Sequence, residues 1–284
     1  MLNALRPLPG LAALTALLAL AACTTPPPGA PASAVPPAAG KPAAAGKPAA
    51  AVPPTAGKPL RVGINPTMPP IAFKEGARMA GMEAELALGL AAHLGRKVEF
   101  VELPWVDLLP ALQRGRVDIV MSGLSITPER SAIVDFTPAY LNSGLVALLR
   151  RNQEAALGYF FNEKVKLGVK PGTTGEFYLQ QEYPRNPVTR FRDPVEAAEA
   201  LRKGRIEVFF IDAPVAWHLA GKYEAAGLTA TTTLLTTEAL AWAVRKGDVP
   251  LLDAATEYLE LIRQNGAKTA IMRRWLGAMY APGK

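Results

Sequence analysis

The feature that most constrains this chain is a change of composition at Leu60. Residues 24–59 consist mostly of Pro, Ala, Gly, Thr and Lys, and such a segment cannot bury enough apolar surface to fold. From Leu60 onward, short apolar segments alternate with segments whose apolar residues recur at helical spacing. The sequence therefore predicts a disordered N-terminal tether followed by a folded α/β part.

The first 23 residues have the pattern of an export signal. Arg6 precedes an apolar segment at residues 11–20 that is too short to span a bilayer as a helix. The sequence LAAC at residues 20–23 then resembles the lipobox of bacterial lipoproteins. The resemblance implies a signal peptide over residues 1–22, a lipidated Cys23 and a tether over residues 23–59. An ordinary cleavage site with an incidental cysteine is the alternative. Thr24 stands where Asp would signal retention in the inner membrane, which slightly favours the outer membrane.

Charge and cysteine usage exclude several classes of function. The formal net charge is +7, of which four units come from Arg6, Lys41, Lys47 and Lys58, so the remainder of the chain carries the other three. Its Lys and Arg residues form no basic stripe. One Cys and two His exclude a disulfide framework and a Cys/His zinc site. We therefore expect no nucleic-acid partner, no metal and no cofactor.

The folded part divides into two units of alternating strands and helices. Strands are predicted at 60–64, 98–102, 117–121, 145–149, 165–169, 208–211 and 239–244, and helices at 82–94, 107–114, 195–202, 214–223, 253–265 and 269–276. This alternation predicts largely parallel sheets. A polar gap at residues 150–154 separates the two units, which predicts two lobes with a ligand cleft between them.

Several segments, in order and at matching spacing, resemble the family 3 extracellular solute-binding proteins, the polar amino-acid binders of ABC importers. They are LRVGINPTMPPIAF at 60–73, GMEAEL at 81–86, DIVMSGLSITPER at 118–130, VDFT at 134–137, GVKPGTTG at 168–175 and IDA at 211–213. The resemblance implies a two-lobed type II periplasmic-binding-protein fold. It also implies a first lobe over 60–147 and 240–284, a second lobe over 148–239, and two hinge segments that cross between them.

An α-amino acid is a zwitterion, so its site needs a fixed cation and a fixed anion. The planar guanidinium of Arg130 suits the carboxylate, and the resemblance places this residue there together with Ser125. It also gives the backbone carbonyl of Gly123 to the ammonium. Thr173 and Thr174 would hold the other side of the carboxylate at a helix N-terminus, and Asp212 would pair with the ammonium.

These residues also have structural interpretations. Arg130 could form an ion pair with Asp135. Thr173 and Thr174 could simply cap a helix, and Asp212 could cap the helix that follows it.

The residues expected around the ligand side chain depart from the family pattern. Met68 stands where the family commonly has Tyr, and Ile71 stands where it has an aromatic residue, although Ile71 also suits the core. Trp105 remains as the large aromatic candidate. Asn65 replaces a common Asp, which argues against a strict Arg or Lys binder. Glu83 and Glu85 leave that question open if either faces the cleft.

The function predicted from this resemblance is a periplasmic, membrane-anchored, monomeric receptor. It would close around an amino acid and deliver it to an ABC permease. The alternative is an enzyme, because the same fold resembles the periplasmic cyclohexadienyl dehydratases. Their catalytic carboxylate would correspond to Glu176. No second residue supports the enzyme, and a Glu in the first turn of a helix is also favoured by the helix dipole.

Overall fold

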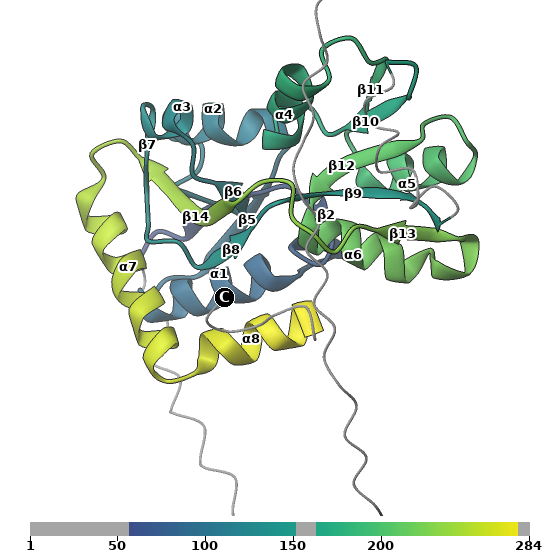
Figure 1. Ribbon diagram of the computed structural model, residues 1–284. Coiled ribbons are helices and arrows are strands. Elements are labelled where there is room, and N and C mark those ends of the chain that lie inside the picture. The colour runs from purple at the N-terminus through teal and green to yellow at the C-terminus, as the bar shows by residue number, and fades with distance from the viewer. Residues whose placement is uncertain (1–56, 152–162, 278–284) are drawn as a thin grey trace, which may run out of the picture. The chain divides into compact units, whose positions relative to one another are not determined.

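The computed structural model describes residues 57–151 and 163–277 (Figure 1). The predicted signal peptide, the proposed lipidation site Cys23 and nearly all of the predicted tether lie outside these residues. Among the helices that are described, none has both the length and the apolar character needed to cross a membrane.

The first of two large sheets has the strand order β5-β1-β6-β14-β7, and β8 also pairs with β14. These strands are β5 (Val98–Glu102), β1 (Leu60–Ile64), β6 (Ile119–Ser125), β14 (Glu238–Arg245), β7 (Val134–Phe136) and β8 (Leu141–Ser143). Its helices are α1 (Met82–His93), α2 (Leu108–Gln113), α3 (Pro128–Ser131), α7 (Val249–Gln264) and α8 (Ala267–Leu276). A 3₁₀ turn, Trp105–Asp107, precedes α2. We call this part the first lobe.

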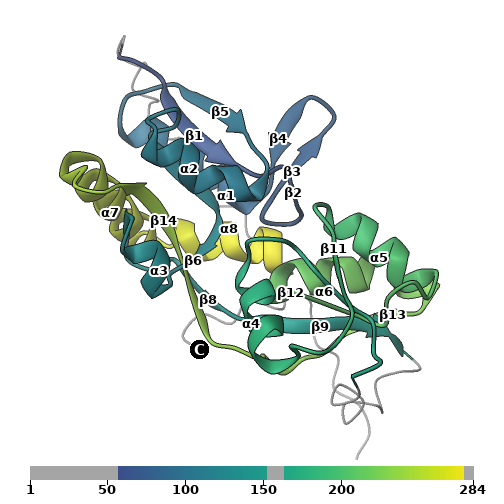
Figure 2. The same ribbon diagram turned by 90° about the horizontal axis from the view of Figure 1, so that it is seen from above.

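The second sheet has the order β11-β10-β12-β9-β13. Its strands are β11 (Val188–Arg190), β10 (Leu167–Val169), β12 (Val208–Asp212), β9 (Leu145–Arg150) and β13 (Leu228–Ala230). It is accompanied by α4 (Thr174–Glu182), α5 (Pro194–Arg202), α6 (Ala213–Lys222) and a 3₁₀ turn, Glu224–Ala226. We call this part the second lobe. Figure 2 shows the two sheets as separate groups of strands, each with its own helices.

The sheets are mixed, which corrects the prediction of largely parallel strands. β1 runs parallel to β5 and β6, and β10 runs parallel to β11 and β12. However, β14 runs antiparallel to β6, and β9 runs antiparallel to β12. The reason is that β9 and β14 enter their sheets from the other lobe, without the crossover helix that makes a parallel neighbour. A small third sheet, β2 (Thr67–Met68), β3 (Ala72–Glu75) and β4 (Arg78–Ala80), was not predicted.

The chain passes between the sheets twice, and the two crossings contact each other. The first lies at Gly144, between β8 and β9, and the second at residues 231–237, between β13 and β14. The backbone N–H of Leu145 donates to Oγ1 of Thr236 over 2.9 Å. A Cβ added to Gly144 would lie 1.9 Å from the carbonyl oxygen of Thr236, so only glycine permits this approach. The lobe boundaries expected from the sequence, at 147/148 and 239/240, stay a prediction.

Candidate ligand-binding site

Arg130 is a buried cation at the boundary between the lobes. It lies in α3, directly after β6, and its residue is 7% exposed. Nη1 donates to the carbonyl oxygen of Ser125 over 2.8 Å, and Nη2 donates to that of Gly172, from the second lobe, over 3.2 Å. Its guanidinium carbon lies 5.8 Å from the centroid of the Trp105 ring. Burial lowers the pKa of Arg130, although an arginine remains charged at neutral pH.

The structural interpretation that paired Arg130 with Asp135 is wrong. Asp135 forms an ion pair with Lys246 over 2.9 Å and accepts a hydrogen bond from the backbone N–H of Gly247 over 2.7 Å. Arg130 has no ion pair within 4 Å among the residues that the structure describes. The charges of Asp212 and Glu238 act on Arg130 from a longer distance.

Asp212 is a buried carboxylate on the second lobe. It ends β12 and precedes α6, but its side chain makes no capping hydrogen bond to that helix. Burial raises the pKa of Asp212 to about 7, and the negative charge of Glu238 adds to this effect. Arg130 and Lys170 act in the opposite direction. A ligand cation beside this carboxyl would favour its ionised form.

The serine and threonine expected to bind a ligand carboxylate are brought together, and a carboxylate of the chain itself occupies them. Oγ1 of Thr174 donates to Oε2 of Glu238 over 2.9 Å, and the hydroxyl of Ser125 donates to the same oxygen. Oγ1 of Thr236 donates to Oε1 of Glu238 over 2.8 Å. Glu238 was not predicted as a site residue. Its one sequence signal is an acid at the start of a strand whose interior is apolar.

Thr173 occupies the N-cap position of α4, but its side chain does not cap the helix. Its Oγ1 instead donates to the carbonyl oxygen of Lys170 over 2.8 Å, which fixes the shape of the loop. The residue is buried. The interpretation of Thr173 as a simple side-chain cap is therefore wrong.

Gly123 lies inside β6 with a φ of +71°. A Cβ there would lie 3.0 Å from Cδ1 of Ile71, so the conformation and the close packing both favour glycine. The backbone N–H of Gly123 donates to Oε1 of Glu83 over 2.8 Å. This bond fixes the backbone next to Ser125.

Neither acid at the start of α1 faces the cleft. Glu83 is fully buried and accepts hydrogen bonds from the hydroxyl of Tyr140 over 2.6 Å and from Nε1 of Trp242 over 2.8 Å. Burial raises its pKa to about 7, against the effect of these donors. Glu85 accepts from Nε1 of Trp275 over 2.8 Å and pairs with Arg274. Both acids therefore serve contacts within the first lobe.

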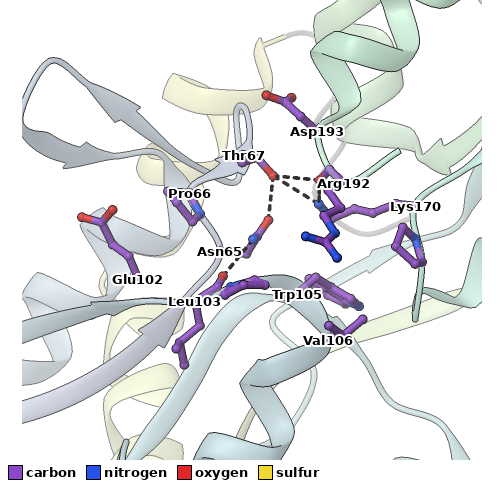
Figure 3. A pocket seen from close by; sticks show the side chains of 12 residues that line it. Asn65, Pro66, Thr67, Glu102, Leu103, Trp105, Val106, Lys170, Arg192 and Asp193 are labelled. Carbon is purple, nitrogen blue, oxygen red and sulfur yellow. Dashed lines mark hydrogen bonds between the residues drawn. The ribbon is translucent and has the colours of Figure 1, made fainter. Parts of the chain in front are cut away.

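A cavity of about 320 Å³ opens between the lobes beside this cluster (Figure 3). Its lining residues are Asn65, Pro66, Thr67, Glu102, Leu103, Pro104, Trp105, Val106, Lys170, Pro171, Arg192 and Asp193. Trp105 connects the cavity to the charged cluster, because its Nε1 donates to the carbonyl oxygen of Gly172 over 3.0 Å and Arg130 lies over its ring. Of the residues proposed from the sequence, Asn65 and Trp105 line this cavity.

The other two residues discussed for the side-chain wall belong to the core. Met68 is 1% exposed and Ile71 is fully buried, and both belong to the same apolar cluster. Ile71 was expected to suit the core. Neither residue is among those that line the cavity.

Lys170 is a cation in this cavity that the sequence analysis did not select. It is 1% exposed, and its Nζ donates to Oγ1 of Thr67 over 3.1 Å and to the carbonyl oxygen of Arg192. Burial lowers the pKa of Lys170 to about 8. The signal for it was its place as the one charged residue in the loop GVKPGTTG.

Glu176, the residue on which the enzyme alternative depends, forms an ion pair with Nε of Arg190 over 2.5 Å and accepts from the backbone N–H of Gly172 over 2.8 Å. Burial raises the pKa of Glu176, but the bonds to Gly172 and Arg190 outweigh it, and the pKa lies below its usual value. A carboxyl held ionised in this way is a poor general acid at neutral pH.

Comparison with known proteins gives consistent matches. Residues 60–278 match the sequence profile of the bacterial extracellular solute-binding proteins, family 3. The L-cystine-binding protein TcyJ of Escherichia coli K12 is 31% identical over 226 residues, which is 77% of this chain and 83% of that protein. A probable histidine-binding protein of Neisseria gonorrhoeae is 30% identical over 219 residues, covering 76% of this chain and 82% of the relative.

Solved structures match to a similar extent. An ancestral arginine-binding protein bound to arginine has a TM-score of 0.73 and 31% identity, over 77% of this chain and 98% of the other. The ancestral amino acid-binding protein AncCDT-1, described as a precursor of cyclohexadienyl dehydratase, has a TM-score of 0.71 and 33% identity, over 76% and 95%. With its two-lobed α/β fold and a profile match over residues 60–278, this chain belongs to the bacterial extracellular solute-binding proteins, family 3.

Proposed function

We propose that this protein is a receptor that binds an α-amino acid between its two lobes and delivers it to an ABC permease. The observation that carries the proposal is the opposition of two buried charges, Arg130 on the first lobe and Asp212 on the second. A zwitterion can neutralise both, whereas a singly charged or neutral solute leaves one of them unpaired. The relatives named for L-cystine, histidine and arginine support this ligand class.

In the proposed complex the ligand carboxylate binds the guanidinium of Arg130 and the donors of Ser125 and Thr174. The ligand ammonium binds Asp212 and the carbonyl oxygen of Gly123. Since Glu238 accepts from both Ser125 and Thr174, the ligand carboxylate would replace this internal carboxylate. Thr173 positions the loop through its bond to Lys170.

The ligand contacts residues of both lobes, so it favours the closed arrangement through its higher affinity for that state. We propose that one lobe comprises roughly residues 60–147 with 240–284 and the other roughly residues 148–239, with boundaries within a few residues of the two crossings. The same proposal makes residues 1–22 an export signal and Cys23 a lipidated residue. The tether then holds a monomeric receptor at a membrane, with the outer membrane slightly favoured.

The enzyme alternative requires Glu176 to deliver a proton. Its ion pair with Arg190 and its lowered pKa argue against that role. Incubation with prephenate and with arogenate tests it directly. Turnover that disappears in Glu176→Gln would replace the receptor proposal with the enzyme.

The receptor proposal is tested by screening the full-length protein, purified in detergent, against the common amino acids and L-cystine. At about 100 times Kd a ligand should raise the free energy of unfolding by roughly 2.7 kcal/mol, which a thermal shift detects. Arg130→Ala and Asp212→Ala should abolish the shift. The matched surface variants Arg78→Ala and Asp253→Ala should retain it, since both residues are exposed. A screen in which no amino acid stabilises the unmodified protein would contradict the proposal.

A further inference from the structure

Lys170 is a buried ammonium with no direct ion pair among the described residues, although the charges of Asp193 and Asp212 act on it from a longer distance. An ammonium has three N–H donors, and in the described part of the chain two of them bond to neutral oxygens, Oγ1 of Thr67 and the carbonyl of Arg192. No carboxylate of the described residues lies within 4 Å of its Nζ. Burying a charge that no carboxylate contacts directly is costly. The third donor and the positive charge therefore remain for a group that enters the cavity.

A second cation faces the same cavity. Figure 3 shows the guanidinium of Arg192 directed into the space between Asn65 and Trp105. Within the described ranges this guanidinium makes no hydrogen bond and no ion pair, and only the backbone carbonyl of Arg192 is bonded. Two cations, one buried and one on the rim, thus converge on the cavity.

The two acids of the cavity wall already have other partners. Glu102 forms an ion pair with Lys74 over 2.6 Å. Asp193 caps α5, accepting from the backbone N–H of Val195 over 2.8 Å. Figure 3 shows both carboxylates at the edges of the pocket.

Asn65, in the wall of the cavity, is neutral, and both ends of its amide are hydrogen-bonded within the chain. Its Nδ2 donates to the carbonyl oxygen of Leu103 over 2.9 Å, and its Oδ1 accepts from Thr67 over 2.8 Å. The cavity therefore offers donors and positive charge, and no unengaged acid, to whatever enters it. A cationic side chain would meet two like charges there.

We propose that the ligand is an amino acid whose side chain ends in a second carboxylate, which Lys170 and Arg192 bind in this cavity. The inference rests on the proposed function, in which Arg130 and Asp212 hold the α-carboxylate and the ammonium. The cavity of about 320 Å³ has room for a long side chain. L-2-aminoadipate offers this chemistry with a carboxylate alone, and L-cystine offers it with a carboxylate and an ammonium.

Isothermal titration of the full-length protein in detergent with L-2-aminoadipate, L-glutamate, L-cystine, L-norleucine and L-arginine tests this assignment. Ligands with a distal carboxylate should bind at least about tenfold more tightly than L-norleucine, which is the gain expected for a charge-assisted contact. Whichever of L-2-aminoadipate and L-cystine binds more tightly shows which kind of distal carboxylate the cavity accepts. L-Arginine as the tightest ligand would overturn the inference.

Two variants separate this subsite from the α-amino-acid site. Lys170→Met keeps the length and apolar stem of the side chain, and Arg192→Ala changes an exposed residue that need not affect folding. Each should remove most of the preference for a distal carboxylate while binding of L-norleucine persists, and the exposed Lys203→Met serves as the control. If both variants keep the preference, this inference is overturned and the proposed function still stands. If the unmodified protein binds no amino acid at all, the proposed function itself is overturned.

Discussion

Arg130 and Gly172 are joined across the lobes: Nη2 of the arginine donates to the carbonyl oxygen of the glycine over 3.2 Å. The same oxygen accepts from Nε1 of Trp105 over 3.0 Å, so one carbonyl of the second lobe binds two donors of the first. Arg130 therefore has two roles, since the cation proposed for the ligand also links the lobes. A substitution there should affect both binding and closure.

Arg130→Lys should weaken amino-acid binding by about 1.4–2.8 kcal/mol, or roughly tenfold to a hundredfold. A lysine ammonium keeps the charge but cannot present the planar fork that bonds to Ser125, Gly172 and a carboxylate together. Isothermal titration beside Arg78→Lys, an exposed control, measures the effect. Equal affinities for Arg130→Lys and the unmodified protein would show that the guanidinium does not contact the ligand.

Amino-acid affinity should rise with pH up to about 7 because of Asp212. Burial, aided by Glu238, raises its pKa to about 7 in the free protein, so below that pH the carboxyl is mostly protonated. A ligand ammonium requires the ionised form, and binding below pH 7 must therefore release a proton. The association constant should increase by up to about tenfold per pH unit between pH 5.5 and 7.

Titration calorimetry at pH 5.5, 6.5 and 7.5, in buffers of different ionisation enthalpy, measures both the affinity and the proton release. Asp212→Asn should bind weakly and lose the dependence between pH 5.5 and 7. Above pH 8 a separate decline is expected for ligands with a distal carboxylate, because the pKa of Lys170 is lowered to about 8. A flat profile in the unmodified protein would exclude Asp212 as the partner of the ammonium.

The sequence predicted the long helices and buried strands of this fold better than its short strands and the direction of strand pairing. Buried apolar segments such as β12 and β14, and the periodicity of α5 and α7, carry a strong local signal. Short strands such as β2, β8 and β13 were missed, because two or three residues pair only where another segment supplies the partner. The antiparallel direction of β9 and β14 likewise depends on the crossings between lobes, which local patterns do not record.

Motifs indicated the proposed charges at Arg130 and Asp212, but the neighbours of those charges had only weak sequence signals. Glu238 and Lys170 are ordinary surface residue types, and only the tertiary structure buries them beside the cluster. The sequence left open whether Glu83 faces the cleft, and it instead binds Tyr140 and Trp242 in the core. Long-range packing decides such cases, which one sequence does not reveal.

Glu83 should make the protein less stable as pH rises through the range 4.5 to 7. Burial raises its folded-state pKa from 4.5 to about 7, so in this range the folded protein holds a proton that the unfolded chain has lost. The unfolded state then binds fewer protons, and the free energy of unfolding falls with increasing pH, by up to roughly 3 kcal/mol for this group. Below pH 4.5 and above pH 7 the contribution is constant.

Urea denaturation at pH 5 and pH 8 checks this sign by comparing the unmodified protein with Glu83→Gln. Between pH 5 and pH 8 the stability of the variant should fall less than that of the unmodified protein. Part of the remaining fall comes from Asp212, whose pKa is also raised. Glu163→Gln is the exposed control. A pH dependence unchanged in Glu83→Gln would mean that the donors from Gly123, Tyr140 and Trp242 keep the carboxylate ionised throughout.

Glu238→Gln should increase amino-acid affinity several-fold. Its carboxylate accepts from Ser125 and Thr174, the donors proposed for the ligand carboxylate, so it competes with the ligand for them. Its charge also raises the pKa of Asp212. Removing the charge weakens the competition and favours ionised Asp212, and each effect is of the order of 1 kcal/mol. The gain should be larger at pH 6 than at pH 8, because Asp212 is already ionised at the higher pH.

Titration of Glu238→Gln and of the exposed control Glu257→Gln at both pH values measures these differences. A fall in affinity would instead identify Glu238 as a second partner of the ligand ammonium beside Asp212.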